Sequence, residues 1–243
     1  MEQTVEILGI PFYNVSQNAF IEELMGAAAN NERRFIVTAN PEIVMHAQQD
    51  IAFNQAVLNA DYIVADGIGV VKAASSIGKP LQGRVTGYDT MLGLLKRANE
   101  MKMRVYFLGA KPNVIEKVVE QVQFNYQNIE VVGARDGYFS AEESALIAEE
   151  ITASEADFVF LALGFPRQEK WIAANLENFK KGIFIGVGGS FDVFSGCTKR
   201  APGIWVKLNL EWLYRILSQP SRWRRAMAIP RFMAAVQRQR KQG

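Results

Sequence analysis

The chain has 243 residues, of which 49% are hydrophobic and 21% charged, and its formal net charge is +2. This composition is typical of a globular protein and excludes the disordered and collagen-like classes, and the length fits one large domain or one domain with an appendage. A single cysteine, Cys197, and a single histidine, His46, exclude an internal disulfide and a zinc site of histidines and cysteines, and they disfavour a hydrolytic triad.

The first residues, 1–4, lack the basic and apolar regions of a signal peptide. No apolar run approaches the ~18 residues that a membrane-spanning helix needs. We therefore expect a cytoplasmic protein.

Short apolar runs then alternate with amphipathic stretches, which is the pattern of an α/β fold. The runs rich in β-branched and aromatic residues predict strands at residues 5–10, 35–39, 62–65, 104–108, 129–133, 157–163 and 183–187. We expect a Rossmann-like fold, in which a mainly parallel sheet is flanked by helices.

Four positions mark the starts of predicted helices. Ser16 is a predicted N-cap, and Pro41 and Pro112 each occupy a predicted first helical position. Ser140 is followed three residues later by Glu143, which is the spacing of a capping box.

From residue 201 onward the sequence predicts helices only. Apolar residues recur at helical spacing in two stretches, which a break at Gln219-Pro220 separates. We therefore expect an α/β catalytic domain over residues 1–198 and a helical, basic, amphipathic appendage over residues 199–243.

The small net charge hides an asymmetry between these two parts. Residues 199–243 hold eleven Lys and Arg against one acid, Glu211, which gives +10 and leaves −8 for the rest of the chain. A basic segment of this kind attracts phosphates, in nucleic acid, lipid head groups or nucleotides, and the count does not choose among them. Two interpretations stay open: a helix pair packed on the core with a solvated basic face, or helices that bind a membrane surface.

Polar residues follow four of the predicted strands. In an open parallel sheet the ligand binds outside the carboxyl ends of the strands, so these positions are the ones to inspect. They lie at residues 38–42, 65–69, 164–170 and 186–192. We expect them to converge on one edge of the sheet.

Asp66 is the best candidate for a general base, because a carboxylate between a buried strand and a glycine-rich helix start can be partly desolvated. An aspartate at such a junction is also typical of a helix N-cap. Thr38 and Asn40 carry the same two interpretations, since Asn40-Pro41 reads as a cap followed by a first helical residue.

The glycine-rich turn at residues 186–189 lets backbone amides approach a phosphate or a ribose. Gly188 and Gly189 are therefore candidates for nucleotide binding, with Asp192 available for sugar hydroxyls and Tyr138 as a further candidate. The spacing fits neither the dinucleotide fingerprint nor the P-loop.

No Asp-x-Asp pair, which often holds a divalent cation on a diphosphate, occurs in the sequence. Arginine can neutralise a diphosphate instead, because its planar fork binds phosphate oxygens in pairs. The candidates are Arg84, Arg215, Arg222 and Arg225, each of which could equally be a surface residue. We expect no metal and no cofactor.

Taken in order, these segments resemble the WecG/TagA/CpsF family of bacterial glycosyltransferases, and most closely its teichoic-acid linkage-unit N-acetylmannosaminyltransferases. The resemblance covers nearly the whole chain and rests on TANPE (38–42), ADGIG (65–69), RVTGYD (84–89), GFPRQE (164–169), GVGGSFD (186–192), RAP (200–202) and EWLYR (211–215).

The resemblance implies an inverting, metal-independent transfer of N-acetylmannosamine from its UDP conjugate to the 4-hydroxyl of N-acetylglucosamine on undecaprenyl diphosphate, which yields a β-linked disaccharide lipid. By similarity, Asp66 is the base that deprotonates the acceptor, and Arg84 binds a diphosphate. The residues implied to contact the sugars are Thr38, Asn40 and Gln168.

The resemblance also implies that the appendage closes over the site at the inner face of the cell membrane. Arg215, Arg222 and Arg225 would then reach the UDP leaving group. A homo-oligomer is left open.

Three alternatives remain. A relative that moves another UDP-sugar, such as N-acetylmannosaminuronic acid or glucose, would differ only in pocket shape. A nucleic-acid-binding protein with a basic tail belongs to another class, and so does a nucleotide-binding regulatory domain without turnover.

Overall fold

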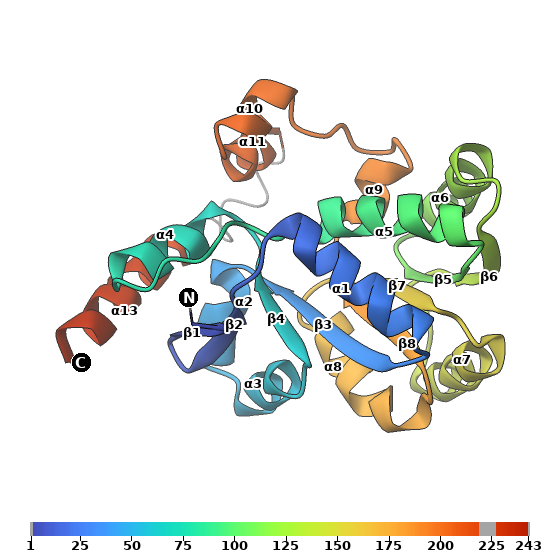
Figure 1. Ribbon diagram of the computed structural model, residues 1–243, viewed down its shortest axis with the longest axis horizontal. Helices are drawn as coiled ribbons and strands as arrows, with labels where there is room; N and C mark the ends of the chain where they lie inside the picture. The colour runs from blue at the N-terminus through green and yellow to red at the C-terminus, as the bar shows by residue number, and fades with distance from the viewer. Residues whose placement is uncertain (1, 219–226, 243) are drawn as a thin grey trace.

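The computed structural model describes residues 2–218 and 227–242. Its centre is a six-stranded sheet in the order β4-β3-β8-β7-β5-β6, and every neighbouring pair of strands is parallel. The strands are β3 (Arg33–Ala39), β4 (Tyr62–Ala65), β5 (Arg104–Gly109), β6 (Glu130–Arg135), β7 (Phe158–Ala162) and β8 (Gly182–Gly186). The predicted α/β fold with a parallel sheet flanked by helices is confirmed (Figure 1).

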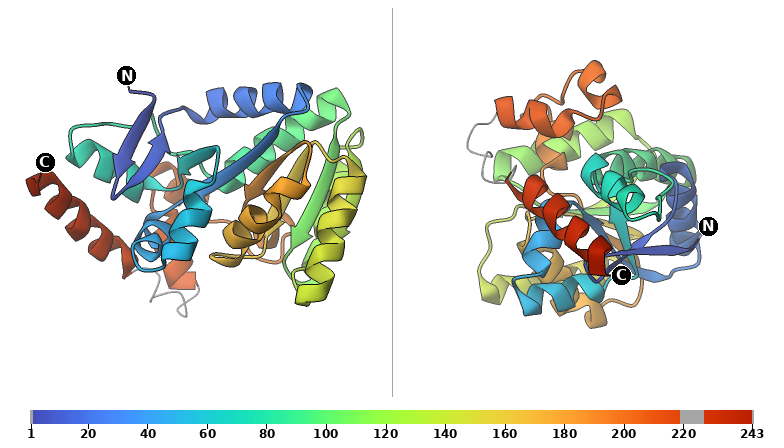
Figure 2. Two further views of the ribbon diagram at one scale, coloured as in Figure 1. Left: turned by 90° about the horizontal axis from the view of Figure 1, so that it is seen from below. Right: turned by 90° about the vertical axis from the view of Figure 1, so that its left-hand side faces the viewer.

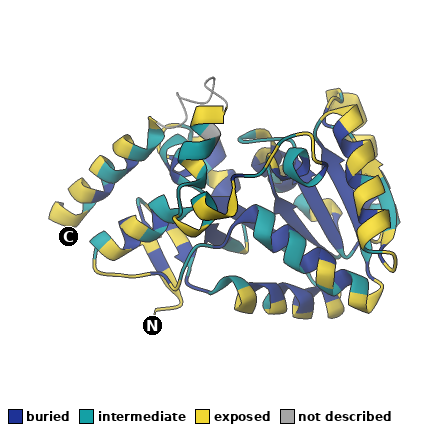
Figure 3. Ribbon diagram, turned by 90° about the horizontal axis from the view of Figure 1, so that it is seen from above, coloured by how far each residue is buried: buried dark blue, intermediate teal, exposed yellow. Residues whose placement is uncertain are grey.

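Helices cover both faces of this sheet, as strands buried on both sides require. One face packs against α1 (Gln17–Ala29), α5 (Gly87–Met101) and α6 (Pro112–Asn125). The other packs against α2 (Pro41–Ala47), α3 (Ile51–Leu58), α4 (Ile68–Ser76), α7 (Ala141–Ser154) and α8 (Arg167–Asn175). Strands β3, β4, β5, β7 and β8 are buried over most of their length, whereas the edge strand β6 is partly exposed and the helices bury only their inner faces (Figure 3).

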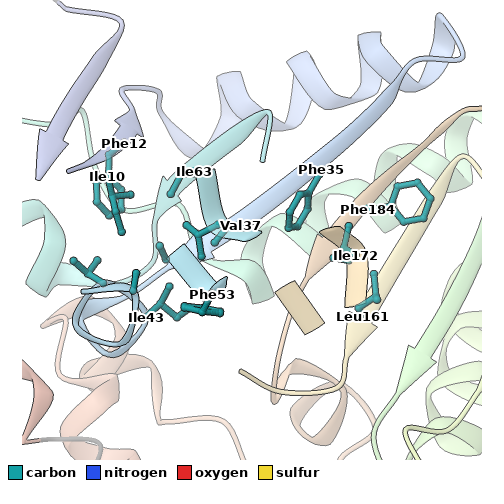
Figure 4. Packing of buried hydrophobic residues seen from close by; sticks show 14 of the residues in the cluster. Ile10, Phe12, Phe35, Val37, Ile43, Phe53, Ile63, Leu161, Ile172 and Phe184 are labelled. Carbon is teal, nitrogen blue, oxygen red and sulfur yellow. The ribbon is translucent and has the colours of Figure 1, made fainter. Parts of the chain in front are cut away.

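Successive side chains of a strand point alternately into these two cores. On β3, Phe35 and Val37 point into the core shared with Phe53 of α3 and Ile172 of α8 (Figure 4). Ile36 belongs to the core on the opposite face. The sheet is thereby fixed on both sides, and its carboxyl-terminal edge is held in one place.

The predicted first strand, at residues 5–10, is wrong in one respect. The chain instead forms a two-stranded antiparallel hairpin of β1 (Thr4–Ile7) and β2 (Ile10–Tyr13), which is separate from the main sheet. Leu8 and Gly9 make the reversal with φ values of 50° and 74°. A leucine with positive φ is uncommon, so the sequence gives a weak signal for this two-residue turn.

The predicted helix starts are confirmed. Ser16 accepts a hydrogen bond from the N–H of Ala19, and Pro112 lies at the start of α6. Ser140 and Glu143 form the capping box of α7.

The C-terminal part of the described chain is helical, as predicted. It comprises α9 (Ser190–Phe194), α10 (Gly203–Lys207), α11 (Glu211–Ser218) and α13 (Ala228–Gln242), and a short 3₁₀ helix (Leu176–Asn178) precedes β8. Helices α10 and α11 project beyond the sheet, whereas α13 returns to lie along α2 and α4 (Figures 1 and 2). Phe232 and Val236 of α13 are fully buried in the core of the α/β body.

Candidate active site

A cleft of about 450 Å³ opens at the carboxyl ends of β4, β3, β8 and β7. Its walls come from the loops that follow these strands, from the segment before α5, and from α11 and α13. The predicted convergence of polar strand ends is therefore observed for the described residues.

Seven of the predicted site residues line this cleft: Thr38, Asn40, Asp66, Arg84, Gln168, Gly188 and Gly189. Asp192 and Tyr138 are not part of its lining, and Tyr138 is largely exposed in the loop after β6. Arg215 lies in α11, but its side chain is outside the described part, as are Arg222 and Arg225.

Asp66 directly follows β4, and its N–H donates to the carbonyl of Ala39 at the end of β3. The N-cap of α4 is Gly67, which has a φ of 100° and makes no side-chain capping bond. The interpretation of Asp66 as the N-cap of this helix is therefore wrong. Because a side chain is strained at such a φ, the glycine lets the chain turn sharply after Asp66.

Thr38 and Asn40 line the cleft at the carboxyl end of β3. The hydroxyl of Thr38 donates to the carbonyl of Gly186 at 3.0 Å, which ties β3 to β8. The Oδ1 atom of Asn40 accepts from the N–H groups of Glu42 and Ile43, so Asn40 caps α2. Its side-chain oxygen is engaged in capping, and a ligand would be recognised through its amide nitrogen.

Gln168 is buried against β8, with only 4% of its surface exposed. Its Oε1 accepts from the N–H of Gly188 at 3.2 Å, and its Nε2 donates to Oε1 of Glu169 at 2.8 Å. A Cβ atom at Gly186 would lie 2.5 Å from this Nε2. Only glycine at position 186 therefore leaves room for the amide where it lies.

Glu169 is a residue that the sequence reading missed. It is 2% exposed, its Oε2 has no hydrogen-bond partner among the described residues, and burial raises its pKa to about 7 although the bond from Gln168 lowers it. A signal exists in the sequence: Glu169 stands three residues before Ile172, so the two share one face of α8.

We expect the Glu169→Gln substitution to change how stability depends on pH. The pKa of this carboxyl is higher in the folded chain (about 7) than its ordinary value of 4.5, so the folded state binds more protons between these values and the wild type loses stability as pH rises from about 4.5 to 7. The loss is on the order of 3 kcal/mol, from 1.36 kcal/mol per pKa unit.

Glutamine does not ionise. The free energy of unfolding of the variant minus that of the wild type should therefore be larger at pH 8 than at pH 5. Urea unfolding of both proteins at the two pH values measures this difference. An equal difference at both pH values would contradict a buried, ionising Glu169.

A second set of charges joins the cleft to the C-terminal helices. Arg84 lies 4.0 Å from Glu211 of α11, and Arg200 binds Asp89 of α5 at 2.7 Å. Arg200 also lies over the ring of Tyr88, 4.4 Å from its centre. The proposed diphosphate ligand Arg84 thus already has an anionic neighbour on the part of the chain that covers the cleft.

Within residues 2–218 and 227–242, no three His, Cys, Asp or Glu side chains are grouped so that they could hold a metal ion. In the same part of the chain, no helix is both long enough and apolar enough to cross a membrane.

Residues 5–243 match the family model described as "Glycosyl transferase WecG/TagA/CpsF family". A protein of Bacillus spizizenii (strain W23) is 43% identical over 235 residues, which cover 96% of this chain and 91% of the relative. Proteins of Bacillus subtilis (strain 168) and Staphylococcus aureus (strain MW2) are each 40% identical, over 98% and 94% of this chain and 93% and 90% of the relatives. All three carry the name N-acetylglucosaminyldiphosphoundecaprenol N-acetyl-beta-D-mannosaminyltransferase.

Proposed function

Since this chain belongs to the WecG/TagA/CpsF family of glycosyl transferases, we propose that it transfers N-acetylmannosamine from UDP-N-acetylmannosamine to undecaprenyl-diphosphate-linked N-acetylglucosamine. The relatives' names support this acceptor and this sugar. One observation of the structure carries the proposal: residues from seven separate chain segments, among them Asp66, Arg84 and Gln168, line a single cleft at the carboxyl edge of the sheet.

The reaction is a single displacement with inversion at the anomeric carbon. The Asp66 carboxylate takes the proton of the acceptor 4-hydroxyl as its oxygen bonds to the anomeric carbon, and UDP departs with the electrons of the broken bond. Thr38, Asn40 and Gln168 hold the sugars near this centre. Arg84 offsets the charge that develops on the leaving diphosphate, in place of a metal ion.

The glycosyltransferase role accounts for both parts of the chain better than nucleic-acid binding does. The negative charge of the α/β body argues against nucleic acid, whose binding gains from positive charge, whereas a polar cleft at the strand ends suits a sugar nucleotide. A salt-dependent gel shift with DNA or RNA would argue for the other class.

The proposed function is tested with the purified full chain, UDP-N-acetylmannosamine and a lipid-diphosphate N-acetylglucosamine acceptor. We expect a disaccharide lipid, identified by mass spectrometry, and one UDP released per transfer. UDP-N-acetylglucosamine and UDP-N-acetylmannosaminuronic acid serve as competing donors. Preference for either of them would keep the enzyme class and overturn the donor assignment.

We also expect activity to survive excess EDTA and not to rise with added manganese, because arginine rather than a metal is proposed to neutralise the diphosphate. Turnover is measured before and after chelation and after metal is restored. A loss on chelation that a divalent ion reverses would instead indicate a carboxylate metal site.

We further propose that α10 and α11 bind the inner surface of the cell membrane, where the lipid-linked acceptor lies. Ile204 of α10, Leu208 directly after it and Leu217 of α11 are exposed, and the exposed Lys199 and Lys207 lie before and at the end of α10. Exposed apolar residues beside basic ones are typical of helices that lie in a membrane interface.

Replacing Ile204, Leu208 and Leu217 together by serine should lower partitioning to anionic liposomes at least tenfold, because each apolar side chain removed from water contributes on the order of 1 kcal/mol. None of the three lines the cleft, so turnover with a short water-soluble acceptor should be retained. The matched control replaces Ile51, Leu58 and Phe124, which are also exposed but lie on α3 and α6, and should bind liposomes as the wild type does. Equal losses in both variants would refute the assignment of this surface.

A further inference from the structure

Three hydrogen bonds at the edge of the cleft join α8, β3 and the turn after β8, and the proposed reaction gives no role to one of the residues involved, Glu169. Glu169 accepts from Gln168, Gln168 accepts from the N–H of Gly188, and the carbonyl of Gly186 in the same turn accepts from Thr38. Gln168 and Glu169 are both almost completely buried. A glutamate in such a place lowers the stability of the folded chain, because burial penalises its charge. A residue kept at that cost is a candidate for a functional role.

The two neighbours of Gln168 fix which way its amide faces. When ionised, Glu169 provides only acceptors, and Gly188 provides a donor, so Nε2 faces the carboxylate and Oε1 faces the N–H. The reversed amide would place oxygen against oxygen and N–H against N–H. A glutamine has two donor hydrogens and two acceptor lone pairs, so one of each stays available to a ligand in a known direction.

We propose that Glu169 is a positioning residue for sugar transfer, which holds the Gln168 amide in the one orientation that presents its remaining N–H and its carbonyl oxygen to the sugars in the cleft. This inference rests on the proposed function for the role of Gln168. It assigns Glu169 no contact with substrate. Loss of the Glu169 acceptor frees the amide to rotate, and misplacement of a group near the reacting centre by about 1 Å can cost 10²-fold in rate.

The first test compares two substitutions at this position. Glu169→Met removes the acceptor at similar volume and should lower kcat about 10- to 100-fold, with KM for the UDP-sugar within about threefold of the wild type. Glu169→Gln keeps an oxygen that can accept from Gln168, so it should restore kcat to within about threefold. A Glu169→Met protein with wild-type kcat would overturn the proposal.

A double-substitution cycle then separates positioning from a general structural effect. If Glu169 acts through Gln168, Glu169→Met should add nothing to the loss caused by Gln168→Ala. Additive losses would overturn the proposal. The matched control is Glu150→Met, because Glu150 also accepts from a buried side chain, Tyr106, but lies on α7 outside the cleft lining; it should lower the melting temperature without a selective fall in kcat.

A readout without substrate distinguishes failure of this inference from failure of the proposed function. The ¹⁵N side-chain amide signal of Gln168, assigned by its absence in Gln168→Ala, should shift in Glu169→Met and stay near its wild-type position in Glu169→Gln. A signal unmoved in Glu169→Met would overturn the positioning role, even if transfer of N-acetylmannosamine is observed. A wild-type chain that transfers no N-acetylmannosamine would refute the donor, while the amide signal would still decide the role of Glu169.

Discussion

The Asp66→Asn variant should bind UDP with wild-type affinity and lose roughly 10²–10⁴ in turnover, which is the usual contribution of general base catalysis. Asparagine keeps the size and polarity of the side chain but cannot take the proton of the acceptor hydroxyl. Asp66 lines the cleft, and Gly67 rather than Asp66 is the N-cap of α4. The loss should therefore appear in the kcat of the folded variant, whose melting temperature is measured alongside.

The control for this prediction is Asp136→Asn. Asp136 also follows a strand, β6, at the same edge of the sheet, but it lies outside the cleft lining, and its carboxylate accepts from the N–H of Tyr138. Turnover of this variant should stay within about twofold of the wild type. A folded Asp66→Asn protein that turns over as fast as the Asp136→Asn control would remove Asp66 from the catalytic role.

The parallel sheet could be predicted from the sequence because each of its strands is a short apolar run between recognisable helix starts. The hairpin could not, because Leu8 reverses the chain at a position where glycine or asparagine is the usual signal. The return of α13 to the core was one of two open interpretations. Helical periodicity identifies an apolar face, but it does not say which surface covers that face.

The residues that line the cleft could also be predicted in part. Thr38, Asn40 and Gln168 were found because polar residues at the carboxyl ends of parallel strands must share one edge of the sheet. Asp192 follows β8 as well, yet it does not line the cleft, because short helix α9 has begun two residues before it. Glu169 was missed, since the only signal in the sequence is that it shares one face of α8 with Ile172, and that face is not known to be buried until the packing of α8 is known.

The ion pairs beside the cleft could not be predicted from the sequence either. The sequence made Arg84 a candidate diphosphate ligand, but its neighbour Glu211 lies more than a hundred residues further along the chain. The same holds for Arg200 and Asp89. Pairing over such separations depends on where the C-terminal helices settle, and no local pattern predicts it.

The C-terminal helix α13 stabilises the α/β body. Phe232 and Val236 are fully buried with residues of α2 and α4, and Gln239 accepts from the N–H of Leu8 in the N-terminal hairpin. Deletion of residues 199–243 would therefore open the core and would not separate membrane anchoring from folding. Single substitutions in α13 test its contribution to stability without removing the other C-terminal helices.

We expect Phe232→Ala to lower the free energy of unfolding by about 3–5 kcal/mol, the usual cost of removing a buried phenylalanine. Helices α2 and α4 begin directly beyond Asn40 and Asp66–Gly67, so turnover should also fall, even with a short soluble acceptor and no membrane. The matched control replaces the exposed Arg231, Arg238 and Arg240 by serine; each change should cost at most about 0.5 kcal/mol. Urea unfolding and turnover of the full-length variants test both expectations. If the three arginine changes destabilise the chain more than Phe232→Ala does, then α13 is held by its charges and not by its apolar face.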